Sequence, residues 1–175
     1  MAREIAVVPY DERWPGLFEQ EKTALECIFR ELIVEIHHFG STSVAGMSAK
    51  PIIDVMVIVK NINEVDAYQK TMAEAGYTSR GENGIPGRRY FVRLEDDGEN
   101  HKTHIHMYEL GSPHTVEELM FRDFLRIDRE AFLQYEAIKK EAARRHRFSP
   151  GAYVDAKTGC VMELMARARA YYNAQ

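Results

Sequence analysis

Apolar residues follow a helical period at the start of the chain and a strand period directly after it. The segment 11–32 predicts a helix, because its apolar residues recur three or four positions apart between charged ones, and Asp11 is the expected N-cap. The segment 34–39 alternates between apolar and polar residues, which predicts a strand. Residues 51–60 predict a second strand that is apolar on both faces, as is typical of a central position in a sheet.

The middle of the chain predicts a helix followed by a hairpin. Residues 61–77 carry an apolar stripe, with Asn63 as the expected cap and Gly76 as the stop. A turn-rich loop follows. Residues 90–95 and 103–110 then predict two strands joined by a polar turn.

The last third of the chain is helical in composition. Residues 115–147 predict two helices, the second capped by Asp128, and residues 155–175 predict a terminal helix after a Pro-Gly break. Helices and strands do not alternate regularly, so the predicted fold class is α+β. We expect a small mixed β-sheet packed with helices, and a C-terminal helical segment that forms a bundle or a cover on that sheet.

Composition and charge narrow the classes of partner. A chain of 175 residues with 45% hydrophobic content predicts a single domain over 1–175. Its 23 basic and 27 acidic residues argue against duplex nucleic acid as a partner, but not against a small phosphorylated ligand. The start of the chain lacks the apolar core of a signal peptide, and no apolar run approaches the roughly 20 residues of a membrane span. We therefore expect a cytoplasmic protein without a membrane partner, whose two cysteines, Cys27 and Cys160, are buried reduced thiols.

Candidate chemistry gathers in a loop of small residues before the second strand. Gly40, Ser41 and Thr42 offer backbone amides and hydroxyls that suit an anion, and Lys50 adds a positive charge nearby. The loop lacks the Gly-Lys-Ser/Thr ending of a P-loop, and an ordinary connection is the alternative. Asp54 follows inside the strand, where an ionised carboxylate is costly without a cation, hydrogen-bond donors or solvent. The simpler interpretation is that Asp54 accepts hydrogen bonds from the loop.

A pair of histidines supplies the second candidate group. His104, His106 and Tyr108 share one face of their predicted strand. Two imidazoles at this spacing can reach one ion or one phosphate, although such a pair more often forms a polar sheet face. If the strand lies beside that of Asp54, the carboxylate and both imidazoles meet at one site.

The remaining basic residues are weaker candidates. Arg122 and Arg126 lie one helical turn apart, so they either clamp a phosphate or pair with acidic neighbours on the helix surface. Lys157 lies near the start of the last helix and is expected to point toward the site. We expect the other cations to be solvated: Arg88, Arg89, Lys139 and Lys140.

The segment 38–57, HFGSTSVAGMSAKPIIDVMV, resembles the signature of the GrpB family. The resemblance continues in WPGLFEQEK at 14–22 and THIHMYE at 103–109, and in two helical segments at 121–143 and 153–164. It therefore covers nearly the whole chain, and the combination is specific although each piece alone is modest evidence.

This resemblance implies a nucleotidyltransferase-like fold, of the kind seen in the palm of polymerase beta. In that superfamily a Gly-Ser loop binds a nucleotide triphosphate, and three carboxylates on two strands hold two magnesium ions. Carried over by position, Gly40 and Ser41 match the loop and Asp54 matches the first carboxylate. The second carboxylate position holds Met56, whose thioether is a poor magnesium ligand, so the two-magnesium set is incomplete.

Together these features predict a GrpB-family protein that binds a nucleotide or another phosphorylated ligand, with nucleotidyl transfer in doubt. A non-catalytic ligand-sensing or protein-interaction module is the alternative. The predicted cofactor is a divalent metal (Mg, Mn or Zn), and two imidazoles with one carboxylate suit Zn or Mn better than Mg. The candidate residues are Asp54 and His106 for catalysis, Asp54, His104 and His106 for metal, and Gly40, Ser41, Thr42, Lys50, Arg122 and Arg126 for phosphate.

Overall fold

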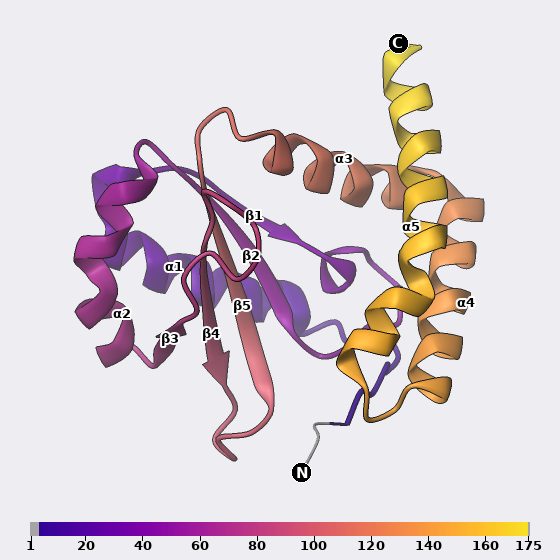
Figure 1. Cartoon of the computed structure of the whole chain (residues 1–175), viewed down its shortest axis with the longest axis horizontal. Coiled ribbons are helices and arrows are strands. Elements are labelled where there is room, and N and C mark those ends of the chain that lie inside the picture. Colours follow the sequence, from indigo (N-terminus) through magenta and orange to yellow (C-terminus); the bar gives the residue numbers. More distant parts are fainter. Residues whose placement is uncertain (1–3, 175) are drawn as a thin grey trace.

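The computed structural model describes residues 4–174 and has an α+β fold built on a five-stranded sheet (Figure 1). The strands lie in the order β1-β2-β5-β4-β3. The β2–β5 pair is parallel and the other neighbours are antiparallel, so the sheet is mixed, as predicted. The strands are β1 (Ile33–Phe39), β2 (Ile53–Val59), β3 (Tyr77–Ser79), β4 (Arg89–Leu94) and β5 (His101–Glu109).

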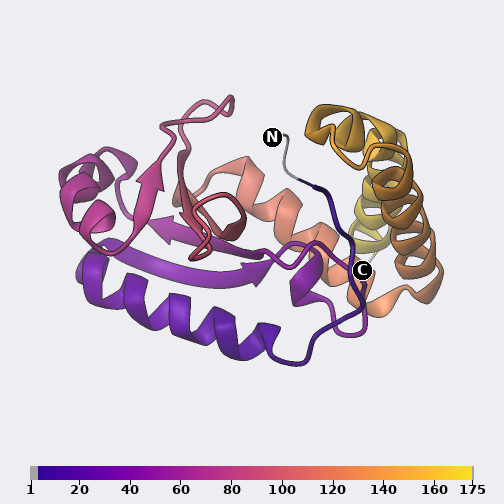
Figure 2. The ribbon, with the colours of Figure 1, turned by 90° about the horizontal axis from the view of Figure 1, so that it is seen from below.

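Helices cover both faces of the sheet, and two further helices lie at one end of it. Figure 2 shows α1 along one face and α3 on the opposite face, with α4 and α5 side by side at the end of the molecule. A C-terminal helical segment was therefore predicted correctly. The α-helices are α1 (Trp14–Phe29), α2 (Gln69–Glu74), α3 (Pro113–Ile127), α4 (Arg129–Arg145) and α5 (Pro150–Asn173), and 3-10 turns form at Arg30–Leu32, Ser41–Ser43 and Ile62–Tyr68.

Strand β2 is central, and its two faces serve different cores. On one face Val55 and Val57 are fully buried in the main core with residues of α1. On the other face Met56 and Ile58 pack with Tyr108 in a smaller apolar cluster, which Leu119 of α3 contacts. The alternation read from the sequence is confirmed, and it leaves Asp54 on the second face.

Some predicted boundaries were wrong and others are confirmed. The segment 61–77 is divided between the 3-10 turn Ile62–Tyr68 and the helix α2, and its cap is Asn61, not Asn63; the Asn61 side chain accepts the Asn63 N–H. The predicted stop at Gly76 is confirmed: α2 ends at Glu74, Gly76 adopts φ +87°, a conformation natural to glycine, and Tyr77 begins β3. Asp128 does cap α4, by accepting the Ala131 N–H.

Three further expectations need correction at the surface and the helix ends. Arg13, not Asp11, is the N-cap of α1, and the Asp11 carboxylate instead accepts the Arg13 N–H. Cys27 is exposed and Cys160 is half-buried, so the expectation of two buried thiols was wrong. Helix α5 begins at Pro150, before the predicted start, so Lys157 lies within it. Across residues 4–174, no helix is long and apolar enough to cross a membrane.

Candidate functional site

The parallel pairing of β2 with β5 brings the predicted carboxylate and histidines together. Asp54 lies opposite His104 in the ladder, and Met56 lies opposite His106. The Oδ1 atom of Asp54 is 3.2 Å from His104 Nδ1 and 3.9 Å from His106 Nε2. One ligand atom from each of these three residues lies within 4.8 Å of the others. The adjacency that the sequence could only suggest is therefore present.

The loop after β1 passes directly over Asp54. Gly40 has φ +68°, and a Cβ atom built on it would collide with Asp54 Oδ2. The Thr42 hydroxyl donates to Ile52 O at 3.3 Å, and its oxygen is 3.0 Å from His38 Nε2, so this side chain fastens the loop to both neighbouring strands. Burial lowers the pKa of His38 to about 4, which makes it a neutral partner.

A pocket of about 250 Å³ opens where this loop and the sheet meet α4 and α5. Most of the residues predicted from the sequence line it: Gly40, Ser41, Thr42, Lys50, Asp54, His104 and His106. Four residues of the C-terminal helices also line it: Tyr135 and Lys139 of α4, and Tyr153 and Lys157 of α5. The site is therefore shared between the sheet and the helical segment.

Lys139 is the main residue whose place the sequence predicted wrongly. It was expected on a solvated helix face, but only 2% of it is exposed, and its Nζ donates to Ser48 O at 2.7 Å. Glu136, about one turn earlier on α4, accepts the Ser48 N–H at 2.8 Å. Burial and the neighbouring Lys157 lower the pKa of Lys139 to about 7. Lys140 is exposed, as predicted.

The lysines of the pocket lie close to two tyrosine rings. Lys50 Nζ lies 5.2 Å from the centre of the Tyr153 ring, and Lys157 Nζ lies 5.3 Å from the same ring. Lys139 Nζ lies 4.7 Å from the ring of Tyr135. Burial raises the pKa of Tyr153, so its hydroxyl stays neutral. Three ammonium groups thus line the same pocket as Asp54, and the expectation that Lys157 points to the site fits this placement.

Arg122 and Arg126 lie outside the pocket lining. Arg122 pairs with Asp123 and donates to His38 O at 3.0 Å, and Arg126 pairs with the same carboxylate and donates to Ser43 O at 2.9 Å. These contacts hold α3 against the end of β1 and the following loop. The surface ion pair, which was one of the two alternatives, is the arrangement observed.

Arg88 is buried, contrary to the expectation of a solvated loop charge. Its Nη1 is 3.3 Å from His106 Nδ1, and its guanidinium donates to two carbonyl groups of its own loop. Arg89 is also paired, through two hydrogen bonds to Asp66. The glycine-rich loop before β4 folds back over the sheet, which buries the first arginine; no periodic signal in the sequence indicates this.

The charges at the centre of the site are set by burial and by neighbouring groups. Burial opposes the charge on Asp54, but the hydrogen bond and charge of His104, followed by the charges of His106 and Lys50, outweigh it, and the pKa of Asp54 is lowered. Burial lowers the pKa of His106 to about 3, and the charge of Arg88 acts in the same direction. A third buried group, Glu118 on α3, was missed; it accepts the Tyr108 hydroxyl at 3.3 Å, and burial raises its pKa to about 7.

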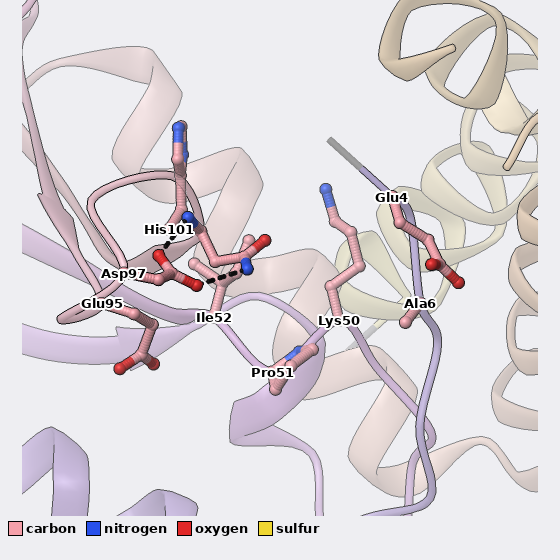
Figure 3. Close-up of a pocket in the computed structure, with 9 residues that line it drawn as sticks. Glu4, Ala6, Lys50, Pro51, Ile52, Glu95, Asp97 and His101 are labelled. Carbon is pink, nitrogen blue, oxygen red and sulfur yellow. Dashed lines mark hydrogen bonds between the residues drawn. The ribbon is translucent and has the colours of Figure 1, made fainter. Parts of the chain in front are cut away.

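A larger pocket of about 450 Å³ adjoins the first and shares Lys50 and Ile52 with it. Figure 3 shows Lys50 between the N-terminal segment that carries Glu4 and the β4–β5 hairpin that carries Asp97.

The two-magnesium set of nucleotidyltransferases does not fit these residues. Met56 is fully buried in the apolar cluster, and Asp54 alone is a carboxylate among the described residues that line the first pocket. A single cation fits better, because the ligand atoms of Asp54, His104 and His106 converge and suit a transition metal.

Comparison with known proteins agrees with this fold. The sequence model of the GrpB protein family matches residues 4–167. The protein YqkA of Bacillus subtilis (strain 168) is 42% identical over 156 residues, which are 89% of this chain and 44% of that protein. The chain thus spans less than half the length of this relative.

Two solved structures define the architecture. The crystal structure of the conserved protein GrpB from Enterococcus faecalis superposes with a TM-score of 0.89 at 33% identity, covering 95% of this chain and 99% of that one. The structure of Cid1 in complex with its short product ApU superposes with a TM-score of 0.53 at 11% identity, covering 79% of this chain and 43% of that one. The second likeness shows the fold alone, which is nucleotidyltransferase-like as predicted.

Proposed function

The chain belongs to the GrpB family, and from this premise we propose that it binds a small phosphorylated ligand, such as a nucleotide, together with one divalent cation. The observation that carries the proposal is the pocket in which Lys50, Lys139 and Lys157 face the same space as Asp54. Three ammonium groups beside a carboxylate and two imidazoles suit a ligand that is itself anionic and metal-bound.

Each part of the pocket has a separate role in this proposal. The backbone of Gly40 and Ser41 and the three lysines would hold phosphate oxygens, while Asp54 with the adjacent histidines would hold the cation. A bound cation would supply charge neutralisation at the phosphate. Arg122 and Arg126 would act on this site only through the loop that they fasten.

Replacing the carboxylate gives the first test. We expect Asp54→Asn to weaken Mn²⁺ or Zn²⁺ binding by about 10–100-fold, since even an outer partner of a metal ligand is worth that much. Calorimetry with each metal, and a thermal-shift screen of nucleotides with and without Mg²⁺, Mn²⁺ and Zn²⁺, would measure it. Asp66→Asn is the matched control, because that carboxylate pairs with Arg89 away from the pocket. Equal behaviour of the two variants would refute the proposed metal site.

Anion binding should depend on pH through Lys139. Its pKa is lowered to about 7, so its positive charge is lost as pH rises through neutrality, while Lys157, Glu136 and Lys140 are its charged neighbours. Sulfate is a suitable probe because its charge is constant over this range. We expect sulfate affinity to fall by up to about tenfold from about pH 6 to about pH 8.5, because the loss of one hydrogen bond to a charged group weakens binding by about that factor.

Two variants isolate this effect. Lys139→Met should bind sulfate weakly and lose the pH dependence, whereas Lys140→Met, which alters the exposed neighbour, should retain it. A wild-type affinity that stays flat across the range would contradict the role of Lys139.

A non-catalytic ligand-sensing or protein-interaction module is a second candidate. Met56 favours it, because an apolar side chain fills the position of the second carboxylate. Under this alternative, nucleotide binds but labelled triphosphates release no pyrophosphate in the presence of Mg²⁺, Mn²⁺ or Zn²⁺.

A further inference from the structure

The two histidines beside Asp54 differ in the group that holds the far side of each ring. His104 Nε2 lies 2.7 Å from His101 Nδ1, whereas His106 Nδ1 lies 3.3 Å from Arg88 Nη1. In a neutral imidazole one nitrogen carries the hydrogen and the other a lone pair, and the partners decide which is which. The two rings are therefore prepared for different tasks.

His104 is able to offer a lone pair to a cation. With a neutral ring, its Nδ1 donates to Asp54 Oδ1 at 3.2 Å, and its Nε2 then accepts from His101 Nδ1 at 2.7 Å. When Nδ1 instead ligates a cation, it gives up its hydrogen and Nε2 acquires one, so the ring remains neutral. The imidazole of His101 accommodates both cases, because its Nδ1 either donates or accepts according to its own tautomer.

His106 lacks this freedom because of Arg88. A guanidinium has hydrogen-bond donors and no acceptor, and it stays protonated, so His106 Nδ1 must accept and Nε2 must carry the hydrogen. Arg88 is held in place by its bonds to Glu82 O at 3.2 Å and Asn83 O at 2.8 Å. The edges of Phe39 and Tyr90 enclose the imidazole ring.

The resulting N–H group is buried beside Asp54 and lacks an acceptor. Among the described residues, His106 Nε2 is a buried atom with no hydrogen-bond partner, and Asp54 Oδ1 at 3.9 Å is beyond hydrogen-bonding distance. The side chain lines the pocket with the lysines. A buried donor left unpaired is costly, so it marks the place where an oxygen of a bound molecule belongs.

We propose that Asp54 and His104 ligate the cation, while His106, held by Arg88 as a positioning residue, donates its Nε2–H to an oxygen of the bound phosphate. This inference rests on the proposed function and refines it. The three-ligand set expected from the sequence becomes two protein ligands and one hydrogen-bond donor. Ligation by His106 would instead place an N–H on Nδ1 against the N–H of Arg88.

The tautomers can be measured directly in the protein without ligand. Two-dimensional ¹H–¹⁵N NMR of the histidine rings is expected to show His106 with its hydrogen on Nε2. In Arg88→Met this preference should relax toward a mixture of tautomers, which a purely structural role of Arg88 would not produce. Finding the hydrogen on Nδ1 in the wild type would overturn the assignment. Because no ligand is needed, the result is independent of the nucleotide and metal screen.

A matched pair of variants tests whether His104 ligates the cation and His106 does not. This test does not depend on whether an Arg88 variant folds. We expect His104→Gln to weaken Zn²⁺ binding by about tenfold or more in calorimetry, as loss of a ligand requires. His106→Gln, which retains an amide donor, should bind Zn²⁺ nearly as the wild type does. A loss of Zn²⁺ affinity in His106→Gln equal to that in His104→Gln would show that both rings are ligands.

Discussion

Met56→Asp is expected to destabilise the fold strongly and not to restore a two-metal site. The Met56 side chain is fully buried among Phe39, Ile58 and Tyr108, beneath α3. A carboxylate there would be an uncompensated buried charge, for which a cost of about 3–5 kcal/mol is usual. Arg88 lies close enough for its charge to act on the Tyr108 hydroxyl of this cluster, but it cannot compensate a new carboxylate. Its guanidinium is already hydrogen-bonded to His106 and to two carbonyl groups. We therefore expect a large decrease in the free energy of unfolding.

Urea unfolding followed by circular dichroism measures this change, with Met56→Leu as the control. Leucine conserves the volume and the apolar character, so its cost should stay below about 1.5 kcal/mol. Equal stability of the two variants, together with tighter Mn²⁺ binding in Met56→Asp, would show that the position remains open to a metal. That result would favour a decayed catalytic site over an apolar one.

The parts of the fold that repeat a pattern were predictable from the sequence. Strand β2 has apolar residues on both faces because α1 packs on one face of the sheet and α3 on the other, and this shows in the sequence as an apolar run that only Asp54 interrupts. The face shared by Asp54 with Met56, and the face shared by His104 with His106, follow from simple alternation. Strand β3 escaped prediction because three residues are too few to show alternation.

The parts of the site that depend on distant contacts were not predictable. Lys139 has the spacing of a surface lysine, and it is buried only because Ser48, 91 positions earlier in the chain, presents its carbonyl there. Arg88 belongs to a loop without periodicity, and its burial follows from the fold of that loop over β5. In both cases a charged residue type predicted a solvent-exposed side chain, and the tertiary structure supplied the hydrogen-bond partner that allows burial.

Gly40→Ala is expected to disrupt both stability and metal binding. Gly40 has φ +68° and ψ −175°, a region that essentially only glycine occupies, so a side chain there costs about 1–3 kcal/mol, and the added methyl group would also overlap Asp54 Oδ2. Asp54 cannot move away freely, because its Oδ1 is hydrogen-bonded to His104 and the β2 backbone is paired on both sides. Overpacking of this kind adds about 1–3 kcal/mol, so we expect a total loss of about 2–6 kcal/mol.

Gly46 separates the two causes, because it lies in the same loop with φ +78° and a methyl group added to it would have no atom within 4 Å. Gly46→Ala should therefore cost only the conformational penalty of a side chain at positive φ, about 1–2 kcal/mol, and should leave Zn²⁺ affinity unchanged. In Gly40→Ala the displaced carboxylate should reduce Zn²⁺ affinity as well as thermal stability. If the two variants lose equal stability and both retain Zn²⁺ binding, the close approach of the loop to Asp54 has no functional consequence. If only Gly40→Ala loses metal, the glycine is required because it lets the backbone lie against the carboxylate that anchors the site.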